Sequence, residues 1–117
     1  MTTFGPQPLS GSSNGLGIKV VATATTGTTI HTAVSGTSSW DEVWLWAYNG
    51  HTANADLTIE FGGVTVPDNV VVFTALPFKV GPIAVIPGWR LQNGLLVRAF
   101  ASVANVFAVT GYVNRLT

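Results

Sequence analysis

The sequence predicts an all-β protein, an antiparallel β-sandwich or jelly roll of about eight strands with an extended N-terminal arm. From residue 16 onward, short runs rich in Val, Ile, Thr and aromatic residues alternate with turn residues, a pattern typical of sandwiches and barrels. The 117 residues suffice for one buried core but not for two. We therefore expect a single β-sandwich domain over 16–117, preceded by an arm over 1–15.

Charged residues are scarce in this chain. Five basic and five acidic residues make up 9% of it, against about 25% in an average soluble domain. A compact chain of this length exposes on the order of 6,000 Å², so a free monomer would show roughly one charge per 600 Å². The formal net charge is zero, which removes most of the repulsion between copies. We therefore expect much of the surface to be covered by other protein chains.

The first fifteen residues combine two prolines, three glycines and several small polar residues. This composition favours an extended segment that becomes ordered on contact with a partner. Its sizeable apolar side chains after Met1 are Phe4 and Leu9, which we expect to anchor the arm on another chain. The first cation is Lys19 and no apolar run precedes it, so no secretory signal is expected.

Strands are expected where β-branched and aromatic residues cluster between turn signals. The candidate segments, some of which should merge or fail, are 17–25, 28–34, 40–48, 56–61, 64–66, 69–75, 82–86, 89–92, 95–101 and 105–114. Four prolines between residues 67 and 87 confine the middle segments to short or edge strands, because proline cannot donate to a ladder.

Residues 56–61 alternate apolar and polar side chains, which predicts a half-buried strand. The expected apolar face holds Leu57, Ile59 and Phe61. The expected wet face holds Asp56, Thr58 and Glu60. Gly62-Gly63 and Asn93-Gly94 suit the positive φ angles of two-residue turns. These turns predict two hairpins. One joins 56–61 to 64–66, and the other joins 89–92 to 95–101.

Two segments also carry helical signals. Ser39 and Glu42 fit a capping box before residues 40–48, and a polar stripe would follow one face of a helix over 95–109. We favour strands in both places. The first run is short and rich in Trp and Val, which suit a pleated surface, and the second would be an otherwise apolar helix. Two strands that turn near 102–104 are expected instead.

As a strand, residues 40–48 would have an aromatic face and an aliphatic face. The aromatic face would hold Trp40, Glu42, Trp44, Trp46 and Tyr48. The aliphatic face would hold Val43, Leu45 and Ala47. The aromatic face has three interpretations: core, which is the usual place of large aromatics, a subunit contact, or a platform that stacks on sugars. The candidate protein-interface residues are Phe4, Leu9, Trp40, Trp44, Trp46 and Tyr48.

No motif in the sequence predicts catalysis or a bound cofactor. The letters G-x-S-x-G occur around Ser13, but a nucleophile elbow needs a preceding strand and a following helix. Asp41 and Glu42 would point to opposite faces of a strand, so they cannot form the carboxylate pair of a glycosidase. We therefore expect a non-enzymatic protein without a cofactor.

Metal binding is not expected either. The chain has no cysteine, which also excludes disulfides, and its histidines His31 and His51 are too far apart for a local metal-binding pair. Folding could bring His51 to Asp41 or Asp56, but we expect a loop histidine and surface carboxylates.

Nucleic acid and membrane are not expected partners. The five basic residues are scattered, whereas nucleic acid requires a concentrated basic face. The densest apolar stretch, 73–89, is interrupted by a lysine, two glycines and three prolines, so it does not read as a transmembrane helix.

The segments "IHTA", "DEVWLWAYN" and "GYVNRLT" resemble small virion proteins of tailed bacteriophages, within a similarity of overall pattern over residues 28–117. Proteins of this family decorate capsids or other parts of the particle, and are commonly β-sandwiches or jelly rolls that sit as trimers on lattice axes. The resemblance implies a decoration (cement) protein on the capsid surface, made in the host cytoplasm. Its implied partners are the phage major capsid protein and further copies of itself in a homotrimer.

Two alternatives to capsid decoration follow from the same sequence. One is a carbohydrate-binding or receptor-binding β-sandwich, in which tryptophans stack on sugar rings, the candidates being Trp40, Trp44, Trp46 and Trp89. The other is a different structural component of the virion, such as a tail, collar or fibre protein.

Overall fold

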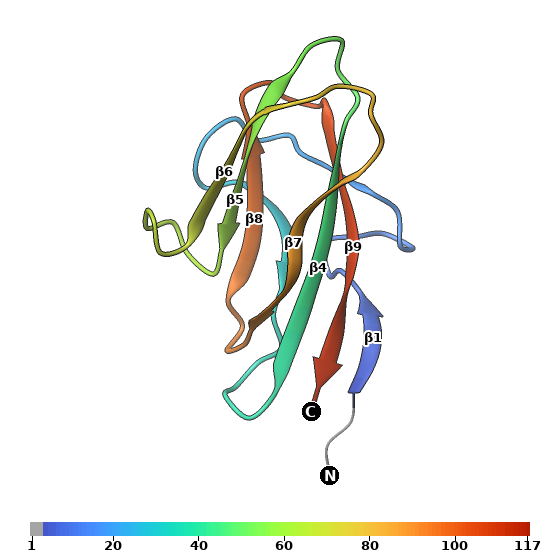
Figure 1. The fold of residues 1–117 in the computed structure, drawn as a ribbon. Coiled ribbons are helices and arrows are strands. Elements are labelled where there is room, and N and C mark those ends of the chain that lie inside the picture. Colours follow the sequence, from blue (N-terminus) through green and yellow to red (C-terminus); the bar gives the residue numbers. More distant parts are fainter. Residues whose placement is uncertain (1–3) are drawn as a thin grey trace.

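The computed structural model describes residues 4–117, in which nine strands and no helix form two antiparallel sheets packed face to face (Figure 1). The strands are β1 (Phe4–Pro8), β2 (Ile18–Lys19), β3 (Thr28–Thr32), β4 (Trp40–Asn49), β5 (Ala55–Phe61), β6 (Val70–Leu76), β7 (Ile83–Leu91), β8 (Leu96–Ala101) and β9 (Phe107–Leu116). The expected all-β sandwich is therefore confirmed.

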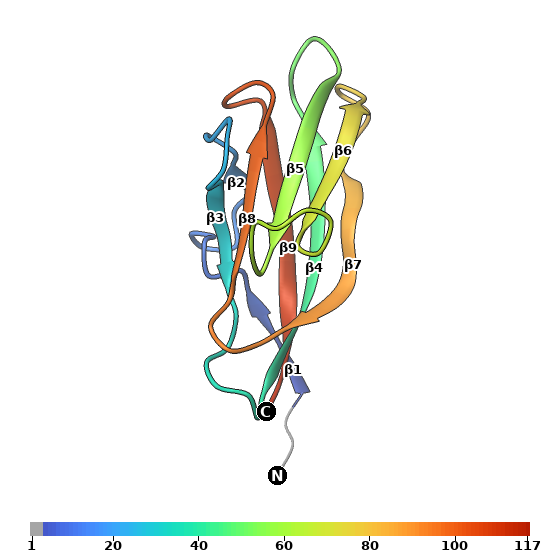
Figure 2. The ribbon, with the colours of Figure 1, turned by 90° about the vertical axis from the view of Figure 1, so that its left-hand side faces the viewer.

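The two sheets have the strand order of a jelly roll. The first sheet has the order β1-β9-β4-β7, with β2 also paired to β9, and the second has the order β3-β8-β5-β6. Figure 2 shows the second sheet in front of the first. From β2 onward the chain crosses to the other sheet at every connection except the one between β5 and β6. Such repeated crossing is the double Greek key of jelly rolls.

The spine of the first sheet is the pairing of β4 with β9, which runs from Trp40 opposite Leu116 to Asn49 opposite Phe107. Along β4, buried residues alternate with half-exposed ones, which is the period of a strand and not of a helix. Strands β8 and β9 likewise replace the possible helix over 95–109 and reverse direction within 102–106. The preference for strands in both segments is confirmed.

The core lies between the sheets and takes aliphatic side chains from both. From the first sheet come Val43, Leu45, Val109 and Val113, and from the second Ile30, Leu57, Ile59 and Val97, all with no more than 1% of their surface exposed. Phe107 at the start of β9 is the largest of the fully buried side chains. Burial of apolar area on this scale is the main force that holds two sheets together.

The turn at Asn93-Gly94 has the expected backbone, but the two strands that it joins lie in different sheets and do not form a hairpin. Both residues have positive φ, 65° and 67°, as a two-residue turn requires. However, β7 before the turn belongs to the first sheet and β8 after it to the second. The hairpin prediction was wrong because turn residues fix a local reversal of the chain, whereas strand pairing is set by which sheet buries each apolar face.

The hairpin expected at Gly62-Gly63 was wrong in its second strand, because β5 pairs with β6 and not with residues 64–66. Residues 64–66 form no strand, and β5 and β6 are connected by a longer loop in which the Asn69 N–H donates to the Thr65 carbonyl at 2.8 Å. Segment 17–25 keeps only the two residues of β2, while segments 82–86 and 89–92 merge into β7. Pro87 lies within β7, which is an edge strand, so its missing N–H breaks no inner ladder.

The described part of the expected arm packs on its own domain. Residues 1–3 lie outside the described residues, but β1 pairs with β9 from Phe4 opposite Leu116 to Pro8 opposite Tyr112. Leu9 has 1% of its surface exposed and belongs to the core, so its assignment as an interface anchor was wrong. Composition alone did not separate a free arm from an edge strand, because prolines and glycines suit both.

Leu9→Ala is expected to lower the free energy of unfolding by about 2 to 5 kcal/mol, the range for truncation of a fully buried leucine. Urea titration followed by Trp fluorescence measures this change. Phe4→Ala is the matched control: the Phe4 side chain is 57% exposed, so the change should stay within about 0.5 kcal/mol. Equal effects of the two substitutions would contradict the placement of Leu9 in the core.

Candidate functional site

The outer face of the first sheet carries a row of aromatic side chains. Val43, Leu45 and Ala47 of β4 are buried in the core, so the alternate residues of the strand point outward. These are Trp40, Glu42, Trp44, Trp46 and Tyr48, the five residues that the sequence predicted to share one face. Two sheets make up the fold of residues 4–117, and no strand or helix covers this outer side (Figure 1).

Three of the outward rings have nearly the same orientation. The ring centroids of Trp44 and Trp46 are 6.5 Å apart and their planes differ by 19°. Tyr112 comes from β9, directly opposite Trp44 in the pairing, and its ring lies 6.2 Å from that of Trp46 at 25°. We call these three residues the aromatic band. Their spacing falls in the range in which aromatic pairs attract one another.

The Glu42 carboxylate holds the Trp44 end of the aromatic band. The Trp44 indole N–H donates to Oε1 of Glu42 at 2.8 Å, and the Asn114 side-chain amide donates to the same oxygen at 3.2 Å. These hydrogen bonds lower the pKa of Glu42. Arg90 on β7 stands 4.0 Å from the other carboxylate oxygen. A fixed indole loses little side-chain entropy when a partner binds it.

Gly88 on the neighbouring strand makes room for the Trp44 ring. Its φ is 84°, and a Cβ added there would lie only 2.7 to 3.2 Å from three carbons of the indole. The ring therefore rests against the bare backbone of β7. Any larger residue at position 88 would displace Trp44, and positive φ adds strain for every residue except glycine.

The usual burial of large aromatics in the core does not hold for β4. Trp44, Trp46 and Tyr48 are half-buried on the outer face, and Trp40 and Tyr112 are 39% and 38% exposed. Phe4 lies at the same end of the sheet as Trp40, since both are opposite Leu116 in the pairings of their strands with β9. The expectation that these residues contact another protein chain stays a prediction.

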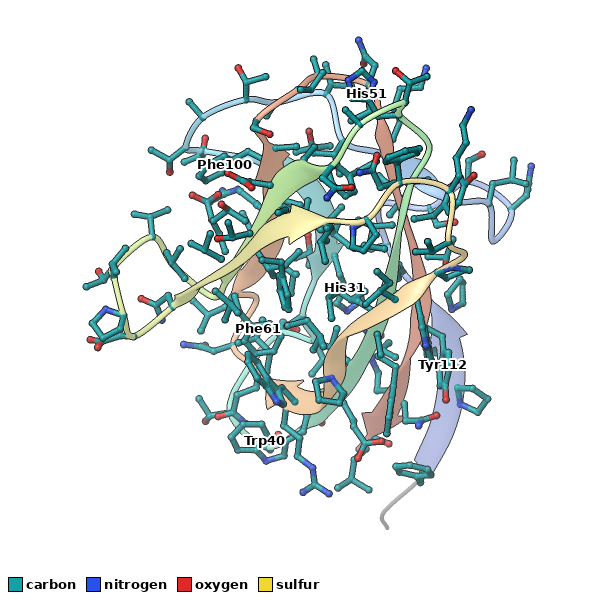
Figure 3. All side chains as sticks on the ribbon, turned by 45° about the horizontal axis from the view of Figure 1, so that its top comes forward. His31, Trp40, His51, Phe61, Phe100 and Tyr112 are labelled. Atoms are coloured by element: carbon teal, nitrogen blue, oxygen red, sulfur yellow. The ribbon has the colours of Figure 1, made fainter. Side chains whose placement is uncertain are left out.

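A buried charge cluster joins the two sheets at the inner side of β4. His31 of β3 and Asp41 of β4 are 1% and 0% exposed, and His31 Nε2 lies 2.7 Å from Asp41 Oδ2. Figure 3 shows His31 in the interior of the molecule. Arg115 of β9 donates to both Asp41 oxygens, from Nε at 2.7 Å and from Nη2 at 3.0 Å. The Val34 N–H also donates to Asp41. Such a fully bonded carboxylate tolerates burial.

The hydrogen bonds of His31 define its tautomer. The Ser10 backbone N–H donates to Nδ1 at 3.0 Å, so the ring proton is on Nε2 and is donated to Asp41. Burial lowers the pKa of His31 and outweighs the hydrogen bond and charge of Asp41, which raise it. Burial raises the pKa of Asp41, but the hydrogen bonds from Arg115 and His31 overcome it, so the pKa lies below its ordinary value.

This cluster has no catalytic geometry among the described residues. A Ser-His-Asp site needs a serine hydroxyl on the imidazole nitrogen that faces away from the aspartate. Here that nitrogen accepts the Ser10 backbone N–H, while the Ser10 hydroxyl accepts the Thr32 N–H at 2.6 Å. The cluster therefore acts as a structural bond between β3, β4, β9 and the segment after β1.

Two carboxylates were expected on the surface and are buried. Asp41 is one, and the other is Glu60, whose exposure is 1% although it occupies the expected wet face of β5. The Thr25 hydroxyl and the Gly27 N–H donate to its two oxygens from the loop before β3, which covers it. Strand alternation had indicated which side of the sheet Glu60 faces, but not that a loop lies over that side.

The remaining sequence candidates stay apart. His51 lies in the loop after β4, at the end of the molecule away from β1 (Figure 3). Asp41, which the sequence considered as a possible partner of His51, binds His31 instead. Within residues 4–117, no three His, Asp or Glu side chains converge in a way that could hold a metal ion. The same residues contain no helix with the length and apolar character of a membrane span.

The His31–Asp41 contact was missed in the sequence, although a signal for it was present. Asp41 has the same parity as Val43 and Leu45, so an aliphatic inner face implies that Asp41 also points inward. A buried carboxylate then demands cationic or hydrogen-bond partners. Which partners meet it depends on pairings between distant strands.

Comparisons with protein-family models, with curated proteins and with solved structures gave no match.

The free energy of unfolding is expected to fall as the pH drops below about 6.5. Because the folded protein lowers the pKa of His31 from 6.5, the unfolded chain binds more protons below that pH and unfolding is favoured. The Asp41 contribution is lost only at lower pH, as the pH falls through its folded pKa, which lies below 3.8. Urea titrations between about pH 7.5 and about pH 5 measure the slope.

His31→Gln should flatten this slope, since an amide can still donate to Asp41 and accept from Ser10 but does not titrate. His51→Gln, at the half-buried histidine of the loop after β4, should keep it. A slope that survives in His31→Gln would show that another group is responsible.

Proposed function

We propose that this chain is a non-enzymatic structural protein of a virion that binds other protein subunits through the outer face of its first sheet. The observation that carries the proposal is the aromatic band Trp44, Trp46 and Tyr112, fixed in place on a sheet face that no other strand of residues 4–117 covers. Rigid, half-exposed Trp and Tyr side chains are the residues most often found to dominate binding between proteins.

The low surface charge supports the same proposal. Ten side chains are charged, and Asp41 and Glu60 are buried, which leaves eight on an accessible surface of 6011 Å². The outer face near the aromatic band holds Glu42 and Arg90, which stand opposite each other and partly neutralise one another. Interface cores are depleted of charge and enriched in aromatics, so this face has the composition of one.

The resemblance to small phage virion proteins supplies the finer part of the proposal. By that resemblance the partner is the major capsid protein of a tailed phage, and the role is to cement the capsid from outside as a homotrimer. Jelly rolls occur in viral capsid and lectin domains, which is an analogy of fold and not of site. A tail, collar or fibre position in the particle is the alternative within this class.

The mechanism of cementing needs no chemical step. A protein that binds only the assembled shell stabilises that state by RT ln(1 + [L]/Kd) at each site. Copies linked around a symmetry axis add avidity without further contacts. A rigid β scaffold with a fixed aromatic face suits this task, because little ordering entropy opposes each binding event.

Self-association is expected at micromolar concentration, because an apolar sheet face left in water favours contact between copies. Size-exclusion chromatography with light scattering should give the mass of a trimer, or a mass that rises with concentration. A monomer at high micromolar concentration would count against self-assembly but would leave binding to a different protein open.

Purified protein added to capsid shells that lack it should bind and raise the temperature at which they rupture. Trp46→Ala and Tyr112→Ala should each weaken binding at least about tenfold, which corresponds to about 1.4 kcal/mol. Val72→Ala is the matched control, since Val72 is 58% exposed on β6 of the second sheet. Circular dichroism confirms that each variant is folded.

Failure to bind any form of the head would reject capsid cementing. If Val72→Ala weakened binding and Tyr112→Ala did not, the docking surface would lie on the second sheet.

A further inference from the structure

We propose that the hollow at one end of the first sheet is a binding site for an acidic sugar, such as a uronic acid residue of a polysaccharide. The hollow has a volume of about 420 Å³ and lies between β2, the loop after β4 and the start of β9. This size falls within the usual range of small-ligand sites, about 300 to 1,000 Å³. The proposal does not depend on the docking of the aromatic band to another protein.

Small residues create the hollow. Gly17, Gly50 and Ala108 line it. A Cβ on Gly50 would lie 3.3 Å from a ring carbon of Tyr48, and one on Gly17 would lie 3.2 Å from the Thr110 methyl carbon. Larger residues at these positions would fill the space or push its walls apart. The small size of these three residues therefore keeps the hollow open.

Backbone hydrogen bonds hold the walls of the hollow. The Gly50 N–H donates to the Val106 carbonyl at 2.8 Å, which ties the loop after β4 to the segment before β9. The Val20 N–H donates to the Phe107 carbonyl at 2.9 Å, and the Asn105 N–H to the Val20 carbonyl at 3.0 Å. These bonds tie the segment after β2 to the same strand. A site so held is preformed, and its ligand does not have to order the loops.

The side chains around the hollow favour an anion. Lys19 lies on its wall, and no aspartate or glutamate does. Within residues 4–117 the Lys19 ammonium forms no ion pair, so its charge is available to a ligand. His51 stands on the same wall and can add a hydrogen bond. One lysine suits a single carboxylate, whereas phosphate sites usually add arginines or a helix N-terminus.

The other lining groups favour a ring with hydroxyls. The Tyr48 ring, half-buried beside Gly50, offers a flat surface to the C–H face of a sugar. Asn105 and Thr52 place an amide and a hydroxyl at the rim, where they can donate to and accept from sugar hydroxyls. A carboxylate beside hydroxyls on a six-membered ring is the chemistry of a uronic acid.

The hollow and the exposed end of the outer face lie at opposite ends of the molecule. Lys19 pairs opposite Ala108 near the start of β9, whereas Trp40 and Phe4 pair opposite Leu116 near its end. Figure 1 shows the β4–β5 and β8–β9 loops at one end and the C-terminus at the other. The aromatic band lies between these two ends, so a protein that docks on the band and toward Trp40 would leave the hollow open.

Isothermal titration calorimetry with a trigalacturonate, with neutral trigalactose as its partner ligand, tests the proposal. We expect binding of the acidic trisaccharide that weakens with salt, and at least tenfold weaker binding of the neutral one. Lys19→Ala should remove this preference, and Tyr48→Ala should weaken binding of the acidic trisaccharide at least fivefold. Lys79→Ala is the matched control, because it removes one lysine charge outside the hollow.

Two results would overturn the proposal. One is the absence of saturable binding to the acidic trisaccharide at millimolar concentration. The other is binding that inorganic phosphate abolishes at equal concentration, since the hollow would then be a general anion site. The shell-binding assay with Lys19→Ala keeps the two proposals apart: unchanged capsid binding is expected whether or not the sugar binds.

Discussion

The register between β4 and β9 is the constraint on which the rest of this molecule depends. A shift of one residue would turn Val43 and Leu45 to the solvent and bring Trp44 and Trp46 into the core. The observed register is held at one end by the bidentate contact between Asp41 and Arg115, which face each other across the two strands. Because each strand continues for ten residues, this single choice fixes the core face and the aromatic face of the whole first sheet. The buried cluster of His31, Asp41 and Arg115 and the aromatic band therefore both depend on this one pairing.

The inner cluster also joins parts of the chain that are distant in sequence. His31 brings β3 of the second sheet to Asp41 of the first, and the Ser10 N–H on His31 attaches the segment that follows β1. Burying the His31 and Asp41 side chains is costly unless each is bonded, and here no buried side-chain nitrogen or oxygen among the described residues lacks a partner. A satisfied polar network is directional, whereas aliphatic packing is not. It therefore selects one arrangement of the sheets among those that aliphatic side chains alone would allow.

The outer side of the same sheet concentrates the features that we connect with function. The half-exposed row of fixed aromatics has the composition of an interface core, and it is the basis on which we propose a protein contact there. Toward the start of β9 the aromatic surface gives way to a hollow with a lysine and polar rims, which has different chemistry. A jelly roll suits such a division, because its loops gather at the ends of the sheets and leave the outer faces of the sheets free. Protein docking on the face and sugar binding at one end can therefore coexist in one small domain.

The sequence by itself determined the all-β class, the strand character of 40–48 and 95–101, and which β4 side chains share a face, because period-two alternation and residue type are local properties. It also indicated the positive φ of Asn93, again a local requirement of the turn. Only the tertiary structure decided that Leu9 enters the core, that Glu60 lies under a loop and that His31 meets Asp41. The tertiary structure also decided which face of β4 became the core. Each of these outcomes depends on strands far apart in the chain, and a local pattern shows that a face is apolar without showing what will cover it.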